Sequence, residues 1–387
     1  MRPDYSTLRD YSTFGWSVSA TQGALREITG TPIREFNLEP DACIHAWREG
    51  RPLIAEMFGP DVRLPSPATP AVSYGHVNCL GSDLRFPEGG EVAHTHIYDS
   101  LEQGIEALKQ PVDFATAGMA PFYIDFQAKM QAAFPDEKVS LGFGGEGPIT
   151  TAYELRGEGF FMDIYDDPEG AAEFLRLTVD SIVAHNGWRA AANGLPFPNP
   201  TGGGMVDDLS SFIVPRNFRR VVLPAWERYY SGITTGRRSA HVEDLRPEQL
   251  IFLEEIGLWS YDPSVSQRLT PPIIVANCRV PFGWRLVNFH YREMSVSDIE
   301  DFVYLSCADG ASSTFTHVCD GMCNAERFEQ VQAFIRAGKE AQRLVSEGCS
   351  REEVRQMVTP ENREGYWDRW CGYLGPNTSR GGAATAS

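Results

Sequence analysis

Residues 203–242 read GGMVDDLSSFIVPRNFRRVVLPAWERYYSGITTGRRSAHV and contain a β-like run, a helical run and a second β-like run. The first β-like run covers 203–206, and the second covers 237–242. A helix is predicted to begin near Pro215 between them, because proline is favoured at the first helical position and apolar residues follow at helical spacing. This order predicts two parallel strands joined by a helix that covers them.

The same alternation recurs along most of the chain. The predicted β-like runs are 71–79, 138–144, 203–206, 237–242, 256–261, 272–278, 285–290 and 312–318. Helices between them have recognisable starts, such as the N-cap Asp167 followed by Pro168, and a capping box opens a short helix at Ser350. Strands that are apolar throughout, each followed by a helix, predict a single α/β domain with a (β/α)8 TIM barrel. A doubly wound sheet fits eight such units less well, and no Pro/Ser-rich linker divides the chain into two domains.

Three regions are expected along the chain. Residues 1–70 mix short polar segments with prolines and aromatic residues, and 41–48 has the pattern of an amphipathic helix. We therefore expect 1–70 to be an N-terminal helical extension packed on the barrel, and 71–375 to be the barrel. The Gly/Ala/Ser/Thr-rich residues 376–387 are expected to form a disordered tail.

The charge balance excludes several classes of partner. The chain has 34 Lys and Arg against 52 Asp and Glu, which gives a net charge of −18. Without a basic stripe we expect no binding to nucleic acid or to an anionic membrane surface. The N-terminus lacks the apolar core of a signal peptide, and no apolar run reaches the roughly 18 residues that a membrane span requires. The eight cysteines are scattered rather than arranged as a disulfide framework, so a cytoplasmic protein is expected.

Polar residues at the ends of the predicted strands are the candidates for a site, since ligands bind barrels at the carboxyl ends of the strands. These residues are His76, His241, Glu243, Asp262, Asn277, Cys278, His290, His317 and Cys319. Residues two apart on a strand face the same side, so His241 and Glu243 can face one ion. Cys319 ends the last predicted strand, which returns beside the first strands in a closed barrel.

These three side chains predict a zinc site formed by His241, Glu243 and Cys319, with an open fourth position typical of catalytic zinc. In the alternative interpretation, His241 is a hydrogen-bonded barrel histidine and Cys319 a core thiol. Whether Cys323 takes the place of Cys319 as a ligand stays open.

Further catalytic and cofactor-binding candidates lie at the same edge. Asp207 and Asp208 follow a strand and are predicted to bind substrate or to act as an acid/base pair, or else to cap the next helix. His290 is predicted to act with them as a catalytic residue. Asp262 and Asn277 are predicted to contact a cofactor.

The glycine-rich stretch Gly142–Gly147 formally matches the dinucleotide fingerprint Gly-x-Gly-x-x-Gly. Pro148 follows at once, and a glycine-permitted turn at the barrel mouth is the alternative, with Gly144 contacting a cofactor there. The sequence has no Gly-x-Ser-x-Gly elbow and no Walker loop, which disfavours the corresponding hydrolases and NTPases.

Four stretches of the chain resemble one known superfamily. They are Gly147-Pro-Ile-Thr-Thr with Phe161-Met-Asp-Ile-Tyr-Asp-Asp-Pro-Glu169; Asp207-Asp208 with Val214-Pro-Arg-Asn-Phe218 and Val222-Leu-Pro224; His241-Val-Glu243; and Cys319-Asp-Gly-Met before Asn324-Ala-Glu-Arg-Phe. In this order they resemble the uroporphyrinogen decarboxylase superfamily. Within it, they are most similar to the corrinoid-pathway methyltransferases, the methylcobamide:coenzyme M methyltransferases and their O-demethylase relatives. The resemblance covers about residues 140–345.

The resemblance implies a TIM barrel and a methyltransferase with a zinc site at His241, Glu243 and Cys319. The methyl group would move between a corrinoid on a partner protein and a zinc-activated thiol or tetrahydrofolate. The chain has no Asp-x-His-x-x-Gly motif, so the cobalamin is expected on the partner. Barrels of this kind commonly pair through their outer helices, and a homodimer is among the expectations.

One position departs from the family pattern. The family's second ligand is a cysteine, whereas this chain has Glu243 at that position. A hard carboxylate oxygen thus replaces a soft thiolate sulfur in the ligand set. Two alternatives follow. One is a metal-free decarboxylase or lyase that acts on a carboxylated substrate, and the other is a barrel that binds a ligand without turnover.

Overall fold

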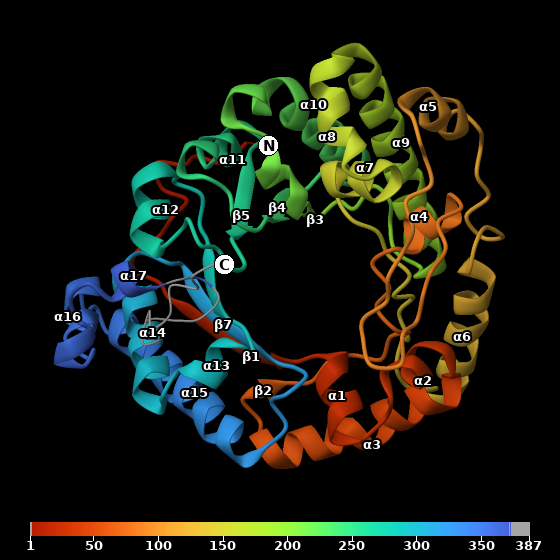
Figure 1. The fold of residues 1–387 in the computed structure, drawn as a ribbon. Helices are drawn as coiled ribbons and strands as arrows, with labels where there is room; N and C mark the ends of the chain where they lie inside the picture. Colours follow the sequence, from red (N-terminus) through yellow and green to blue (C-terminus); the bar gives the residue numbers. More distant parts are fainter. Residues whose placement is uncertain (1, 371, 373–387) are drawn as a thin grey trace, which may run out of the picture.

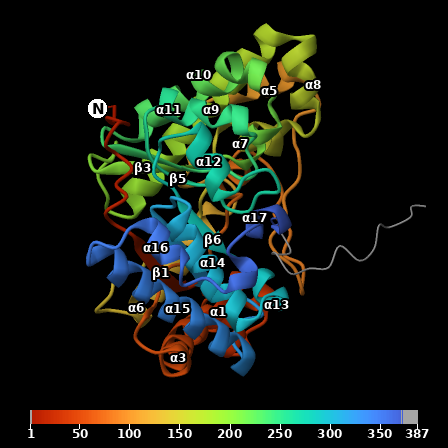
Figure 2. The same ribbon diagram turned by 90° about the vertical axis from the view of Figure 1, so that its left-hand side faces the viewer.

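The computed structural model describes residues 2–370 and 372, so the tail predicted for 376–387 lies outside the described residues. The described chain is a mixed α/β structure in which the helices form an outer ring around the strands (Figure 1). Figure 2 turns this ring by 90° and shows α14 (Val296–Ala308) and α16 (Arg351–Arg355) on the side that carries β1 (Gly15–Ala20) and β6 (Gly283–Leu286). Among the described residues, no helix combines the length and the hydropathy that crossing a membrane would require.

All strands within the two sheets run parallel. Their bounds are β1 (Gly15–Ala20), β2 (Val62–Arg63), β3 (Gly202–Val206), β4 (Arg237–His241), β5 (Leu258–Asp262), β6 (Gly283–Leu286) and β7 (Ser313–Val318). One sheet has the order β2-β1-β7-β6, and the other has the order β3-β4-β5. β1 pairs along its whole length with β7, from Gly15 opposite Ser313 to Ala20 opposite Val318.

Single bridges continue the parallel pairing between and beyond the two sheets. Tyr261 of β5 bridges Phe282 next to β6, which connects the two sheets on one side. The segments 68–72 and 140–143 pair through two parallel bridges. The N–H of Gly147 donates to the carbonyl of Val206 at the end of β3. The pairing therefore follows the ring in Figure 1 through most of its circumference.

Most of the helices lie in the connections between strands, and the last three follow the last strand, β7. The helices are α1 (Gln22–Ile28), α2 (Ile33–Leu38), α3 (Pro40–Phe58), α4 (Gly75–Cys79), α5 (Leu101–Leu108), α6 (Ala120–Ala133), α7 (Pro148–Arg156), α8 (Gly159–Asp166), α9 (Pro168–Ala192), α10 (Pro215–Ile233), α11 (Ile251–Glu255), α12 (Pro271–Asn277), α13 (His290–Glu293), α14 (Val296–Ala308), α15 (Ala325–Ser346), α16 (Arg351–Arg355) and α17 (Tyr366–Arg369), with short 3-10 turns η1 (Asp208–Phe212), η2 (Pro247–Gln249) and η3 (Pro360–Asn362).

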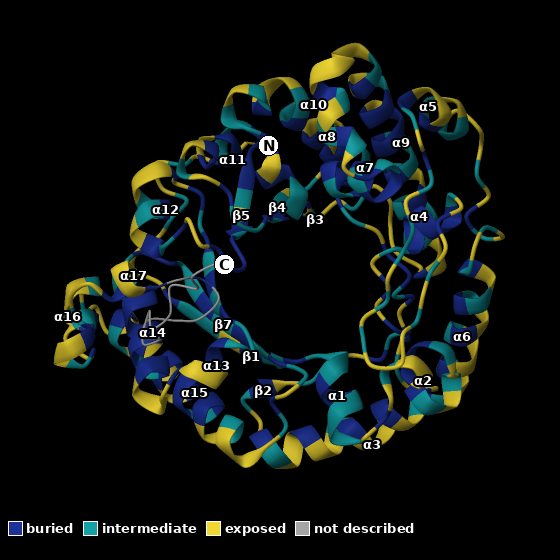
Figure 3. Ribbon diagram, viewed as in Figure 1, coloured by how far each residue is buried: buried dark blue, intermediate teal, exposed yellow. Residues whose placement is uncertain are grey.

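The core lies between the strands and the helices. In β6 and β7 the alternate residues Trp284, Leu286, Thr314 and Thr316 are buried, as expected for strands covered on one side by helices. Figure 3 shows the complementary pattern in the helices, whose inward faces are buried and whose outward faces are exposed. The opposite side chains of the strands face the inside of the ring, and this is where the candidate site forms.

Several predicted elements are confirmed. The strands expected at 203–206, 237–242, 256–261 and 312–318 correspond to β3, β4, β5 and β7 within two residues at each end. α9 begins after the Asp167 cap, whose side chain accepts a hydrogen bond from the Gly170 N–H. The capping box at Ser350 and Glu353 opens α16.

Other predicted elements were wrong. The strand expected at 272–278 is wrong: Pro271–Asn277 form helix α12, because Pro271 and Pro272 open a helical turn and the short apolar run fits either structure. Residues 75–79, expected inside a strand, form helix α4. The region 1–70 contains the expected helix as part of α3, and it also contributes strands β1 and β2 to one sheet.

Candidate functional site

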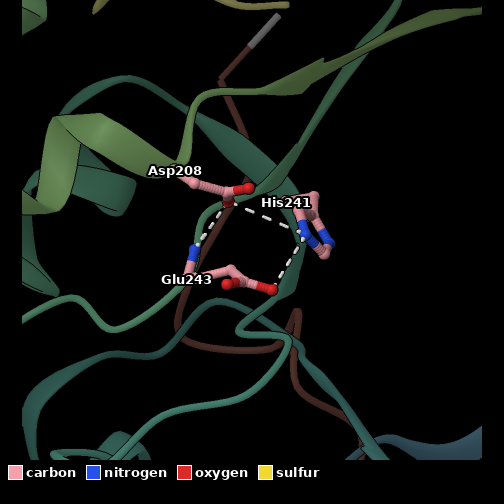
Figure 4. A group of neighbouring side chains, drawn as sticks. All are labelled: Asp208, His241 and Glu243. Carbon is pink, nitrogen blue, oxygen red and sulfur yellow. Dashed lines mark hydrogen bonds and ion pairs between the residues drawn. The ribbon is translucent and has the colours of Figure 1, made fainter. Parts of the chain in front are cut away.

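Three potential metal ligands come together at the carboxyl ends of β3 and β4 (Figure 4). The Oδ1 atom of Asp208 lies 3.7 Å from Nε2 of His241, and Oε1 of Glu243 lies 3.8 Å from the same nitrogen. One ligand atom of each side chain lies within 4.8 Å of the others. Asp208, His241 and Glu243 are half-buried, so they are shielded from bulk water but open to a small ligand.

The local sequence explains this convergence. Ala240 and Val242 are buried, so His241 and Glu243 project to the opposite side of the chain. Asp208 directly follows β3, which pairs in parallel with β4, and the carboxyl ends of the two strands are therefore adjacent. The backbone N–H of Glu243 donates to Oδ1 of Asp208 at 2.9 Å, which fixes the two segments to each other.

Asp262 at the end of β5 orients the imidazole of His241. Its Oδ2 atom lies 2.7 Å from Nδ1 of His241. A carboxylate can only accept, so Nδ1 donates, and Nε2 is the ring nitrogen that faces Asp208 and Glu243. Burial lowers the pKa of His241, but the hydrogen bond to Asp262 and the charges of Asp262 and Asp208 outweigh it and raise the pKa overall.

Ser264 and Arg285 hold Glu243 from the other side. The hydroxyl of Ser264 donates to Oε1 of Glu243 at 2.5 Å, and the Arg285 guanidinium lies 3.7 Å from the same oxygen. Arg285 also donates to Ser264 and lies 3.8 Å from Oδ2 of Asp262. One guanidinium thus balances part of the negative charge of two carboxylates. Ser264 has a φ of 50°, in the left-handed region that non-glycine residues rarely adopt, as is common near functional sites.

Asp207 is fully buried and points away from this group. It accepts hydrogen bonds from the N–H groups of Ile149 and Thr150, at 2.9 and 2.8 Å, and from Nε1 of Trp226 at 2.6 Å. Burial raises the pKa of Asp207 to about 7, although the bonds from Thr150 and Trp226 oppose that shift. The side chain ties the N-terminus of α7 to β3, a role of fold and positioning.

His290 lies outside the group formed by Asp208, His241 and Glu243. Its Nδ1 accepts from the N–H of Val287 at 3.2 Å, and its Nε2 bonds the carbonyl of Gly372. It is buried, and burial lowers its pKa to about 4. The structure therefore places His290 as a neutral imidazole with both ring nitrogens bonded.

Cys319 and Cys323 are not members of the group formed by Asp208, His241 and Glu243. The thiol of Cys319 contacts the sulfur of Met322 at 3.9 Å, and burial raises its pKa to about 11. Cys323 lies 3.6 Å from the carbonyl of Ala24. Neither sulfur belongs to a group of three ligand atoms within 4.8 Å of one another in the described part of the chain. The structure thus combines His241 and Glu243 with Asp208 rather than with Cys319.

Asn277 and Gly144, the other two predicted cofactor contacts, have different surroundings. Asn277 is exposed at the end of α12, where its amide donates to the carbonyl of Ile273. A Cβ at Gly144 would lie 2.9 Å from the Arg189 guanidinium, and one at Gly147 would lie 2.6 Å from Cβ of Asp207. The backbone at Gly144 and Gly147 therefore lies so close to neighbouring groups that a side chain there would meet them.

Two cavities border the group. A cavity of 830 Å³ is lined by Asp208 and by the α7 residues Thr150, Tyr153 and Glu154. A second, of 400 Å³, lies among the strands and is lined by His241 and Asp262. Small strand residues leave this second space open: Gly204, Ser239, Ser260, Gly283 and Ser313. A ligand at the group would have room on both sides.

Sequence reasoning missed the supporting residues Ser264 and Arg285. Arg285 is the one charged residue in the run Trp284–Val287, and a charge inside an otherwise buried strand is a usable signal. Ser264 offers no comparable signal, because only the fold brings it to Glu243, 21 residues away.

No protein-family model and no curated protein matches the sequence. Among solved structures, a methyltransferase from Methanosarcina mazei superposes with a TM-score of 0.61 over 85% of this chain and 94% of that chain, at 16% identity. A Listeria monocytogenes protein assigned by name to the vitamin-B12-independent methionine synthases covers 85% of this chain and 97% of its own, at 13% identity and a TM-score of 0.44. The first likeness shows that this chain shares the fold of the Methanosarcina protein.

Proposed function

We propose that this protein is a methyltransferase with a (β/α)8 barrel of the uroporphyrinogen decarboxylase type, which binds zinc at Asp208, His241 and Glu243 to activate an acceptor thiol. The observation that carries the proposal is the orientation of His241, whose Nε2 faces two carboxylates while Asp262 holds Nδ1. The shared fold with a methyltransferase structure supports the reaction class.

The three side chains fit a zinc ion. Tetrahedral coordination with bonds of about 2.1 Å places ligand atoms roughly 3.4 Å apart. The separations of 3.7 and 3.8 Å from His241 to Asp208 and Glu243 need only a small contraction. Three protein ligands leave the fourth position free, as in catalytic zinc sites. We assign the third ligand to Asp208 instead of Cys319, because Asp208 already lies beside the other two.

Zinc bound there would lower the pKa of a coordinated thiol, so that the thiolate is available at neutral pH. The chain's own groups prepare this position. Asp262 keeps the proton of His241 on Nδ1, and Ser264 and Arg285 hold Glu243. Asp207 anchors α7, whose residues line the larger cavity.

The methyl donor in this proposal is a methylcobamide on a separate corrinoid protein, as the resemblance of residues 140–345 implies. The acceptor is a small thiol. Tetrahydrofolate is the alternative acceptor, because relatives that use it do not need a zinc-bound thiol.

A metal-free decarboxylase acting on a carboxylated substrate is supported less well. Carboxylates of Glu91, Glu146, Glu154, Asp208 and Asp320 line the 830 Å³ cavity, whereas Arg26 is the one Lys or Arg among its lining residues and is paired with Asp320 at 2.6 Å. An anionic substrate would meet repulsion there.

A methyl-transfer assay tests the proposal. We expect purified protein to methylate the uncharged thiol 2-mercaptoethanol with methylcobalamin as the donor, to lose this activity in a chelator and to regain it with zinc. The His241→Ala variant should be inactive, while His45→Ala, at an exposed position of α3, should match wild type. Methyl transfer to tetrahydrofolate that is insensitive to the chelator would contradict the thiol mechanism, and release of carbon dioxide from a carboxylated substrate would favour the decarboxylase.

A further inference from the structure

One wall of the 830 Å³ cavity combines carboxylates with aromatic rings. Glu154 and Tyr153 belong to α7, Glu146 lies just before it, and Tyr74 comes from the loop before α4. These four side chains lie outside the group formed by Asp208, His241 and Glu243, and the activation of a thiol does not use them.

Glu154 is the unusual member of this wall. Its residue is only 3% exposed, and its Oε2 atom is buried with no hydrogen-bond partner in the described structure. Burial, together with the charges of Glu146 and Asp207, raises the pKa of Glu154 well above its ordinary value. A buried acceptor without a partner is costly, and a positively charged ligand in the cavity would relieve that cost.

The aromatic rings of the wall are held in place by histidines. The ring of Tyr74 packs on His94 with centroids 4.4 Å apart, and Tyr153 meets the edge of His96 at 5.2 Å. The faces of aromatic rings attract cations, and rings combined with carboxylates are the usual means of recognising alkylated ammonium groups.

The charge of the cavity selects the same class of ligand. Arg26, which is paired with Asp320, is the one Lys or Arg among the lining residues, and five carboxylates surround the space. A metal ion is a poorer candidate for this wall. Among the described residues, three potential metal ligands come together at Asp208, His241 and Glu243. Neither Glu146 nor Glu154 belongs to that group.

We propose that the wall formed by Glu146, Glu154, Tyr74 and Tyr153 binds a small organic ammonium ion. The carboxylate of Glu154 pairs with the positive charge, and the two tyrosine rings contact the alkyl groups on nitrogen. If the protein transfers methyl groups to a thiol, this site makes the acceptor a thiol that also carries an ammonium group; that assignment rests on the proposed function, whereas the binding itself does not.

Calorimetric titration of the full-length, chelator-treated protein tests the binding. The probe is choline, and its uncharged counterpart of the same shape is 3,3-dimethyl-1-butanol. We expect choline to bind about tenfold more tightly than the alcohol, which is the scale of a desolvated cation–π contact plus an ion pair. Glu154→Gln and Tyr153→Leu should each weaken choline binding by about tenfold. The control Glu173→Gln, on the exposed face of α9, should bind as wild type does.

Equal affinity for choline and the alcohol, or no heat from choline, would overturn the inference. It would also be overturned if Glu154→Gln bound choline as wild type does while keeping the wild-type melting temperature. If Glu154→Gln does not fold, the choline affinity of Tyr153→Leu tests the inference in the same way. Because the titration contains no zinc and no methyl donor, its outcome is independent of the methyl-transfer assay.

Discussion

His241 and Asp262 are joined by a hydrogen bond of 2.7 Å between Nδ1 and Oδ2, made across the neighbouring strands β4 and β5. The bond fixes the tautomer of the imidazole and directs Nε2 to Asp208 and Glu243. A metal-binding histidine usually donates its second ring N–H to a carboxylate that does not touch the metal. Asp262 has this position relative to His241. The relationship explains why Asp262 belongs to the site although it is not one of its proposed ligands.

The first prediction concerns this outer partner. Asp262→Asn should weaken zinc binding by about tenfold to a hundredfold, because the amide no longer fixes the imidazole as a carboxylate does. Competition with a chromophoric chelator measures the affinity. The control is Asp61→Asn, where the carboxylate pairs with Lys339 on the surface. Unchanged zinc affinity in Asp262→Asn would show that His241 is oriented in another way.

The second prediction concerns Asp207. Asp207→Asn should lower the free energy of unfolding by about 1–3 kcal/mol, since the amide N–H₂ would face the Nε1–H of Trp226 and leave a buried donor unpaired. Urea denaturation measures the change. The matched control is Asp208→Asn, at a half-buried position where water can replace lost contacts. A stable Asp207→Asn protein that had lost methyl transfer would instead indicate a direct catalytic role.

The third prediction concerns the glycine-rich turn. Gly147→Ala should destabilise the protein by about 1–3 kcal/mol, because the new methyl group would overlap Cβ of Asp207 and the carbonyl of Val206, both at 2.6 Å. Thermal unfolding compares it with Gly89→Ala, where a Cβ meets nothing within 4 Å. Similar melting temperatures for the two variants would mean that the turn can accommodate an added methyl group despite these short distances.

The fourth prediction concerns pH and His76, which is buried and bonds Ser181 through Nε2. Burial lowers the pKa of His76 to about 3, so the unfolded chain binds a proton below about pH 6.5 while the folded chain does not. The stability that neutral His76 contributes is present above that pH and is lost as the pH falls towards 3.

Relative to His76→Gln, the free energy of unfolding of the wild type should therefore fall by up to about 1.4 kcal/mol per pH unit below pH 6.5. Urea denaturation from pH 7.5 to 5 measures the difference, with the exposed His45→Gln as the control. A constant difference over that range would show that folded His76 takes up its proton as readily as the unfolded chain does.

Much of the fold could be predicted from local patterns. β3, α10 and β4 follow from the order of residues 203–242, and α9 from its cap at Asp167, since propensity and capping act over a few residues. The strand predicted at 272–278 was wrong, because a short apolar run does not distinguish a helix from a strand. β1 was missed because its pairing with β7 joins residues almost 300 positions apart.

The candidate site was accessible to sequence reasoning only in part. The spacing of His241 and Glu243 predicts that they lie on one side of the chain, and in the structure they do. Their role as metal ligands stays a prediction. Asp208 was predicted as a substrate contact, and nothing in the sequence shows that it, rather than Cys319, joins His241 and Glu243. Contacts between strand ends, such as those of Arg285 with Glu243 and Asp262, depend on the register of the sheets.

The most direct test is the zinc content of purified, zinc-loaded protein, measured by elemental analysis for wild type, Asp208→Ala, His241→Ala and Cys319→Ala. We expect about one zinc per chain in wild type and in Cys319→Ala, and the loss of zinc in Asp208→Ala and His241→Ala. Wild type without zinc, or zinc that is lost in Cys319→Ala but retained in Asp208→Ala, would contradict the proposed zinc site.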